Sequence, residues 1–278
     1  MSEAANDPLA HELETNGYAI VRGVFDADEV SRLRQLAARH LATGGVPQVF
    51  GRVQPNAAVE IPALSWLFAS DKVLSLFRRA LRTDDIVFTG HADVQRDLRS
   101  GWHKDSGHGP GDYFNGDYFG ASNCRVYKLA LYLEDHIDSG LSVQPATHHD
   151  AAIDRNALGL PLATKAGDAI LFDVRLTHGG QRRDLFERFL VNVVRRLRVG
   201  TAVLVWLHDR YLGGRNRRYS IFFTFGVPNA FTEDFAAGNM RRQLEQTASP
   251  FKPLPAALKA ELERRGVRIA AALSPTPR

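Results

Sequence analysis

Two short triplets place a histidine and an aspartate two positions apart, His91-Ala92-Asp93 and His103-Lys104-Asp105. In a strand, side chains at positions i and i+2 point to the same face, so each triplet offers an imidazole and a carboxylate side by side. Such a pair can bind a metal ion from one direction. Triplets of this kind also arise by chance as surface polar residues. For the first triplet, a structural or supporting role is the favoured interpretation.

A histidine further along the chain supports the second triplet. Residues 167–174 predict a turn and a buried strand, and His178 follows that strand beside a glycine. Two histidines and one carboxylate form the facial triad of non-haem Fe(II) oxygenases, which leaves three metal positions open for other ligands. His103, Asp105 and His178 are therefore the candidate metal ligands.

The segments around these residues predict a β core. Short apolar runs separated by Gly, Asp, Asn and Pro are typical of an all-β sandwich or barrel. Such runs occupy residues 86–94, 125–133, 141–145, 169–172 and 220–225.

Helical patterns precede and follow this core. Residues 17–25 predict a strand, after which Asp26 and Glu29 form a capping-box sequence that begins a helix. Residues 64–81 and the tail from 256 to 265 have apolar or good helix-forming residues at helical spacing. We expect a single domain over residues 1–278, with a helical N-terminal part of about 1–85, a β core of about 86–235 and a C-terminal helical tail.

Composition excludes several classes of protein. The 278 residues are 44% hydrophobic and 24% charged, which is ordinary for a globular protein and excludes a disordered or collagen-like chain. Cys124 is the only cysteine, so neither an internal disulfide nor a Cys-based zinc site can form, which fits a cytoplasmic location. A net charge of +4 is too small by itself to indicate nucleic-acid binding. No apolar run approaches the ~20 residues of a membrane-spanning helix, and no secretory signal is visible.

Five segments occur in a characteristic order, at residues 16–25, 102–105, 140–148, 167–178 and 218–223. In this order they resemble the phytanoyl-CoA dioxygenase (PhyH)-like family of Fe(II)/2-oxoglutarate-dependent oxygenases, over about residues 10–235. The family fold is a double-stranded β-helix, a cupin-like jelly roll that is mainly β with flanking helices. This fold agrees with the β pattern of the chain.

The resemblance implies that His103, Asp105 and His178 bind Fe(2+) and that 2-oxoglutarate and O2 are co-substrates. It also implies an arginine on the strand after the distal histidine, because a guanidinium binds a carboxylate through two parallel hydrogen bonds. We assign this role to Arg218, with Ser220 as a hydroxyl partner.

Two other arginines remain alternatives for the same role. Arg188 follows the distal histidine at the usual distance of about ten residues, whereas Arg218 begins the more strand-like run. Arg217 is the third candidate. The choice of Arg218 requires an insertion at about residues 181–217, which is rich in arginine. This insertion would bind an anionic substrate, contact an acidic membrane surface or form a helical cover or dimer contact.

Three further features have two interpretations each. Lys128, within an apolar strand, either points into the barrel toward 2-oxoglutarate or lies on the solvent face. His148 and His149 follow a proline turn, where a structural role is expected more often than metal binding. The glycine- and aromatic-rich residues 106–120 predict a lid or substrate-lining loop, or else a surface loop packed by its own aromatic side chains.

These features predict an Fe(II)- and 2-oxoglutarate-dependent dioxygenase that hydroxylates a C–H bond of a small organic, anionic or natural-product substrate. Succinate and CO2 are the expected co-products. Desaturation, cyclisation and epimerisation use the same residues and stay open, as do the substrate, a biosynthetic role and homo-oligomer formation. Two alternatives are a cupin-like enzyme that uses another metal without 2-oxoglutarate and a catalytically silent jelly-roll binding protein.

Overall fold

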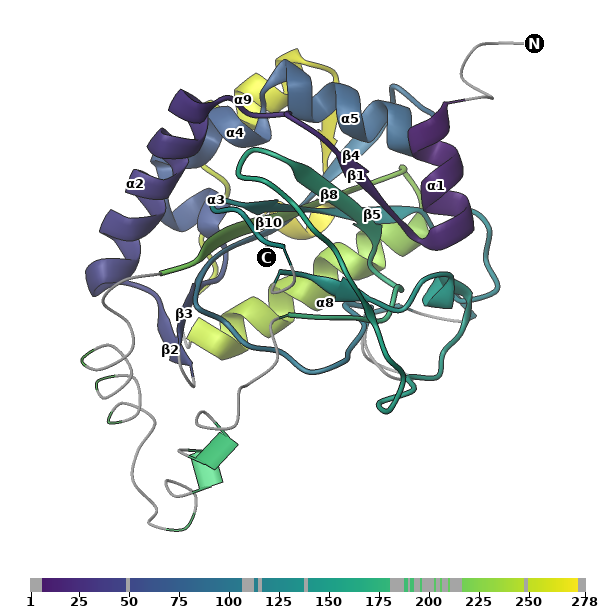
Figure 1. Ribbon diagram of the computed structural model, residues 1–278. Helices are drawn as coiled ribbons and strands as arrows, with labels where there is room; N and C mark the ends of the chain where they lie inside the picture. Colours follow the sequence, from purple (N-terminus) through teal and green to yellow (C-terminus); the bar gives the residue numbers. More distant parts are fainter. Residues whose placement is uncertain are drawn as a thin grey trace.

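Helices pack on one side of a large twisted sheet, and a second, smaller sheet lies on the other side (Figure 1). The computed structural model describes residues 7–48, 51–106, 113–114, 117–137, 140–180, 217–247 and 250–274, with isolated positions between 188 and 210. Most of the predicted insertion at 181–217 and much of the predicted lid at 106–120 lie outside the described residues.

The large sheet has eight strands and joins segments from both ends of the chain. Its order is β1-β8-β5-β10-β4-β3-β2, and β11 pairs with β4 beside this path. All of its pairings are antiparallel except that of β11 with β4. The strands are β1 (Tyr18–Val21), β2 (Val46–Gln48), β3 (Gly51–Gln54), β4 (Ile86–Arg96), β5 (Val126–Tyr132), β8 (Ala169–Asp173), β10 (Tyr219–Gly226) and β11 (Val267–Ile269).

The small sheet carries one end of the predicted site. Its order is β7 (Leu160–Pro161), β6 (Ser142–Val143) and β9 (His178–Gly179), and an isolated bridge adds His103 opposite His178. The two sheets do not close into a barrel over the described residues. The predicted fold class, a jelly roll that is mainly β with flanking helices, is confirmed.

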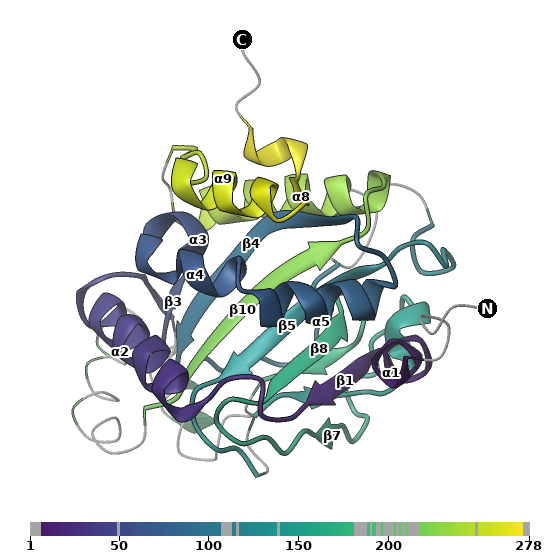
Figure 2. The ribbon, with the colours of Figure 1, turned by 90° about the horizontal axis from the view of Figure 1, so that it is seen from above.

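Most helices cover the outer face of the large sheet, whereas α8 lies on the other side along β4 (Figure 2). In the predicted capping box, Asp26 accepts a hydrogen bond from the Glu29 backbone N–H at 2.9 Å, and the Glu29 side chain accepts one from the Asp26 backbone N–H at 3.0 Å. The helices are α1 (Pro8–Asn16), α2 (Ala27–Thr43), α3 (Ala57–Glu60), α4 (Ser65–Phe68), α5 (Asp71–Leu81), α8 (Ala230–Thr247) and α9 (Ala256–Arg264), with 3-10 turns at Pro62–Leu64, Thr147–His149 and Ala271–Leu273.

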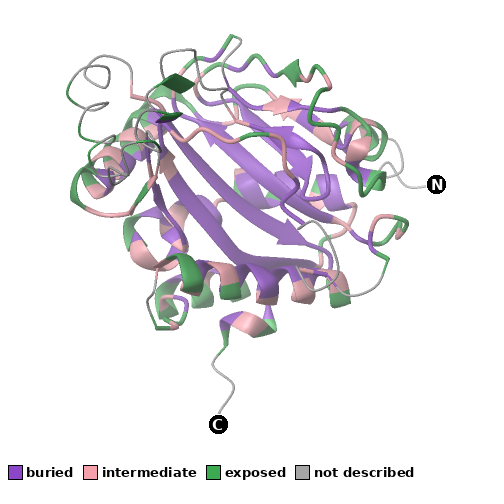
Figure 3. Cartoon of the chain, turned by 90° about the horizontal axis from the view of Figure 1, so that it is seen from below, coloured by how far each residue is buried: buried purple, intermediate pink, exposed green. Residues whose placement is uncertain are grey.

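The two faces of β10 contact different parts of the molecule, because successive side chains of a strand alternate between faces. Phe223 and Phe225 belong to the core under the helices, where the Phe225 ring lies 4.5 Å from that of Phe77. Ser220 and Phe222 face the opposite way, toward the space between the sheets. The central strands are buried on both faces (Figure 3).

The pattern of apolar residues located the strands of the core but not α8. The inner stripe of this helix mixes Phe235 with Asn239 and Arg242, so its sequence shows little amphipathic contrast. Among the described residues, no helix is both long and apolar enough to cross a membrane.

Asp168 joins the N-terminal strand to the sheet. Its carboxylate accepts hydrogen bonds from the backbone N–H groups of Gly23 and Lys165, each at 2.9 Å, and from the guanidinium of Arg22 at 2.7 Å. We expect Asp168→Ala to lower the free energy of unfolding by about 2–3 kcal/mol at pH 7, because it orphans two backbone donors. Urea denaturation measures this difference.

The same contacts predict how the effect depends on pH. Burial opposes ionisation of Asp168, but the hydrogen bonds from Lys165, Arg22 and Gly23 outweigh it and lower its pKa below the ordinary 3.8. The stabilisation by a carboxyl with a lowered pKa is complete above the pKa of the unfolded chain and is lost as pH falls through the folded pKa. The destabilisation should therefore shrink below about pH 4. Asp84→Ala, at a fully exposed side chain, is the control and should change little.

Candidate active site

The three predicted metal ligands converge at one place between the sheets. Their ligand atoms lie within 4.8 Å of one another. Nε2 of His178 is 3.3 Å from Oδ2 of Asp105, and Nε2 of His103 is 3.8 Å from Oδ1. The two histidines face each other because their backbones exchange hydrogen bonds of 2.9 Å in both directions.

The hydrogen bonds of the two imidazole rings leave both Nε2 atoms ready to bind a metal. Nδ1 of His103 donates to the Gly101 carbonyl, and Nδ1 of His178 donates to the Leu176 carbonyl, each at 2.9 Å. Since a carbonyl only accepts, Nδ1 carries a proton in each ring, so Nε2 is the nitrogen that is available to a metal. Burial, together with the nearby His178, lowers the pKa of His103 to about 4, so the ring is neutral as a metal ligand must be.

Asp105 supplies the negative charge. Burial opposes its ionisation, but Lys128 and the two imidazoles hold its pKa well below the usual range. The Nζ of Lys128 lies 2.6 Å from Oδ2 of Asp105, a buried ion pair at the centre of the site. Two imidazoles beside a buried carboxylate form a donor set that fits a divalent cation such as Fe(II).

The turn that carries these ligands is held from behind. The backbone N–H of Asp105 donates to the Val174 carbonyl at 2.9 Å. The buried ammonium of Lys104 donates to the carbonyls of Thr147 and Arg175 at 2.7 and 2.8 Å. The guanidinium of Arg175 in turn forms a buried ion pair with Asp173 at 2.8 Å. These contacts fix the spacing of the ligands before any metal binds.

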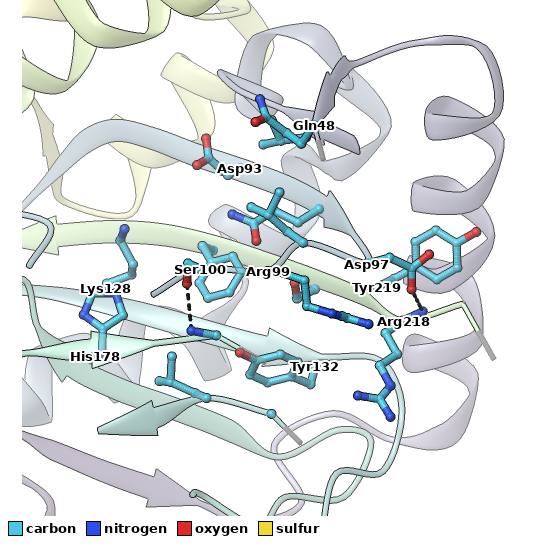
Figure 4. A pocket seen from close by; sticks show the side chains of 18 of the residues that line it. Gln48, Asp93, Asp97, Arg99, Ser100, Lys128, Tyr132, His178, Arg218 and Tyr219 are labelled. Carbon is cyan, nitrogen blue, oxygen red and sulfur yellow. Dashed lines mark hydrogen bonds between the residues drawn. The ribbon is translucent and has the colours of Figure 1, made fainter. Parts of the chain in front are cut away.

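A cavity of about 220 Å³ extends from the metal ligands along the inner face of the large sheet (Figure 4). Arg218 lies at its far end, where its backbone N–H donates to Asp97 Oδ1 at 2.9 Å. Two residues further along the chain, Ser220 of β10 pairs in register with Tyr132 of β5 on one side and with Gln95 of β4 on the other. A cation directly before β10 and a hydroxyl on that strand therefore both line the cavity.

A sequence model of the phytanoyl-CoA dioxygenase (PhyH) family matches residues 13–183. The chain belongs to the phytanoyl-CoA dioxygenase family. It is accordingly an Fe(II)/2-oxoglutarate-dependent enzyme, with Fe(II), 2-oxoglutarate and O2 as its cofactor and co-substrates. This membership disfavours both the cupin without 2-oxoglutarate and the silent binding protein.

Solved structures similar to this PhyH-family chain share its fold at low sequence identity. The epimerase SnoN from nogalamycin biosynthesis is 15% identical, over 81% of this chain and 84% of its own, with a TM-score of 0.55. EctD from S. alaskensis, solved with 2-oxoglutarate and 5-hydroxyectoine, is 16% identical over 82% and 78%, with a TM-score of 0.55. HygX from Streptomyces hygroscopicus, solved with nickel and 2-oxoglutarate, is 16% identical over 78% and 85%, with a TM-score of 0.53. A search of curated proteins found no match.

Of the three arginines considered for the PhyH-type co-substrate site, the structure brings one to the cavity. Arg218 lines it, whereas Arg217 and Arg188 are not among the described lining residues. Arg217 lies next to Arg218 along the chain, and its backbone carbonyl accepts a hydrogen bond of 3.4 Å from Arg34. Arg188 is exposed. Lys128 points into the interior, the first of its two interpretations.

Three other histidines that the sequence analysis named do not belong to the cluster of candidate metal ligands. His148 is buried, with Nε2 3.2 Å from the Glu14 carbonyl, and His149 is exposed. His91 is buried, and its Nδ1 lies 2.9 Å from the Thr224 hydroxyl. Its triplet partner Asp93 lines the cavity, a placement that agrees with a supporting role.

Sequence reasoning missed two residues that line the cavity, Tyr132 and Arg242. Tyr132 ends an apolar strand and resembles a core aromatic residue, and Arg242 lies in the helix that the periodicity did not reveal. The strand alternation from Lys128, which places positions 130 and 132 on the same face, was the one available indication for Tyr132.

Proposed function

We propose that this enzyme hydroxylates a C–H bond of a small organic substrate, with His103, Asp105 and His178 as the iron ligands. The observation that carries the proposal is the meeting of two Nε2 atoms and a carboxylate at one end of a cavity that has Arg218 at the other end. Hydroxylation requires of the protein only that one C–H bond be held beside the metal. Epimerisation also requires a hydrogen donor on the opposite face of the substrate.

Different residues of the chain bind the metal and orient the co-substrate. When bound, Fe(II) with 2-oxoglutarate and O2 supplies the oxidising chemistry, and succinate and CO2 leave. The two imidazoles and Asp105 would hold the metal at one end of the cavity and would leave other coordination positions for the co-substrates. Arg218 binds the distal carboxylate of 2-oxoglutarate through its fork of N–H donors, and the hydroxyl of Ser220 adds a further donor.

Two more residues shape the electrostatics and water content of the site. The ammonium of Lys128 balances negative charge at the metal, where Asp105 and the co-substrate carboxylate lie together. Phe222 and Tyr132 line the wall between the metal and Arg218 and exclude water from the reacting atoms.

We also infer that the chain acts as one catalytic domain. Strands β1 and β11, from opposite ends of the chain, both pair within the large sheet that carries Lys128 and Arg218. A cut between the predicted N-terminal part and the β core would therefore remove strands from the sheet that builds the site.

Oxygen labelling tests the reaction type. Compounds that raise the rate of succinate formation by the Fe(II)-loaded enzyme are incubated under ¹⁸O₂, and product and succinate are analysed by mass spectrometry. Hydroxylation places one labelled oxygen atom in succinate and the other in the product. Label in succinate alone, with an unlabelled but altered product, would show desaturation, cyclisation or epimerisation instead.

A further inference from the structure

A polar cluster lies between β4 and α8, outside the group of metal ligands. Asp93 of β4 and Arg242 of α8 both line the cavity, and Nη2 of Arg242 is 4.0 Å from Oδ2 of Asp93. His91 lies one pleat away on β4, with its Nε2 3.5 Å from the same carboxylate oxygen. Neither the metal ligands nor the predicted 2-oxoglutarate residues account for this cluster.

The inner stripe of α8 brings a buried amide to the same place. Positions 235, 239, 242 and 246 follow one another at helical spacing and share one face. The Phe235 ring lies 6.3 Å from that of His91, and Arg242 lies beside Asp93. Asn239, between them on this stripe, is 1% exposed. Gln246 at the end of the stripe also lines the cavity.

The polar atoms of this cluster lack hydrogen-bond partners. Within the described part of the chain, Oδ1 of Asp93, Nε2 of His91, Nε of Arg242 and both amide atoms of Asn239 are buried without one. Each unpaired buried polar group is costly, so native proteins rarely leave several side by side. Their concentration beside a cavity indicates a polar ligand that supplies the missing partners.

The charges of the cluster restrict the chemistry of that ligand. Burial opposes ionisation of Asp93, but His91, Arg242 and Lys128 lower its pKa, so the carboxylate is an acceptor only. Arg242 is a donor only, and the two charges balance each other. Asn239 offers one acceptor and two donors. A neutral hydroxyl group suits this set, because it donates to the carboxylate, accepts from the guanidinium and adds no unmatched charge.

We propose that Asp93 and Arg242 form a substrate subsite for an uncharged polyhydroxylated compound of the sugar or cyclitol class; the buried Asn239 lies on the same stripe of α8 but is not among the residues that line the cavity. This inference rests on the proposed function, because the subsite shares one cavity with Asp105 and His178. A polyol held between β4 and α8 presents its ring C–H bonds toward the open side of the metal. Hydroxyl groups of the polyol bridge Asp93 and Arg242.

Binding without turnover tests the subsite. The full chain is loaded with Zn(II) and 2-oxoglutarate, and saturation-transfer NMR measures binding of myo-inositol and methyl α-D-glucopyranoside, with octanoate and L-lysine as charged comparisons. We expect transfer to the two polyols. Asp93→Asn and Arg242→Gln should each weaken polyol binding about 10- to 100-fold, since each removes one charged hydrogen-bonding partner. Arg241→Gln, the same change at the exposed neighbouring position of α8, should not.

Several outcomes would overturn the assignment. One is saturation transfer to octanoate or lysine but to neither polyol. Another is polyol binding that survives both substitutions. A third is an equal loss of 2-oxoglutarate affinity in the same variants. A parallel succinate assay with Fe(II) and O2 separates the two proposals. Polyol binding without succinate formation would contradict the function but support the subsite. Succinate formation without polyol binding would contradict the subsite alone.

Discussion

His178→Ala is expected to abolish iron-dependent succinate formation, with a loss of at least about 100-fold. The substitution removes one of three ligand atoms that lie within 4.8 Å of one another and leaves one imidazole and one carboxylate. It leaves the backbone bridge to His103 in place, since that bridge uses main-chain atoms only. Isothermal titration with Fe(II) under anaerobic conditions should show a comparable loss of metal affinity.

The control for this variant is His149→Ala. His149 is exposed and lies outside the metal group, so its loss should leave metal affinity and succinate formation close to those of the unaltered protein. If His178→Ala retained full metal affinity, the ligand set proposed here would be wrong. A folded variant that binds no metal but still decarboxylates 2-oxoglutarate would contradict it equally.

Arg218→Gln is expected to raise the KM for 2-oxoglutarate roughly 30- to 150-fold, because a buried carboxylate then loses its charged donor, at a cost of about 2–3 kcal/mol. Arg218, directly before β10, lines the cavity together with Ser220 and Phe222 of that strand, and its backbone N–H donates to Asp97. Metal affinity measured without co-substrate should stay the same. Initial rates of succinate formation at saturating Fe(II) measure the change.

Arg217→Gln is the matched control for Arg218→Gln. It makes the same chemical change one position earlier, where the side chain is not among those that line the cavity. Its KM for 2-oxoglutarate should therefore remain within about threefold of that of the unaltered protein. Arg188→Gln completes the set. A large KM effect in Arg217→Gln or Arg188→Gln, with none in Arg218→Gln, would move the co-substrate site to that residue.

Local sequence determined the metal-ligand candidates and the core strands of this protein. The capping box at Asp26 and Glu29, and the His103-x-Asp105 pair, depend on spacings of two or three residues that secondary structure imposes wherever it forms. The β pattern from residue 86 onward likewise follows from alternation within single strands. A distant histidine at a strand end was sufficient to complete the proposed triad.

Tertiary structure decided which face each strand turns toward the site. Alternation predicts that successive side chains of β10 point to opposite faces, but only the packing of Phe223 and Phe225 against the helices shows which face is the core. The same packing turned Lys128 inward. The polar residues of α8 can be recognised as a candidate binding site only beside Asp93. Buried donors and acceptors without a partner are identified only when two distant segments pack against each other.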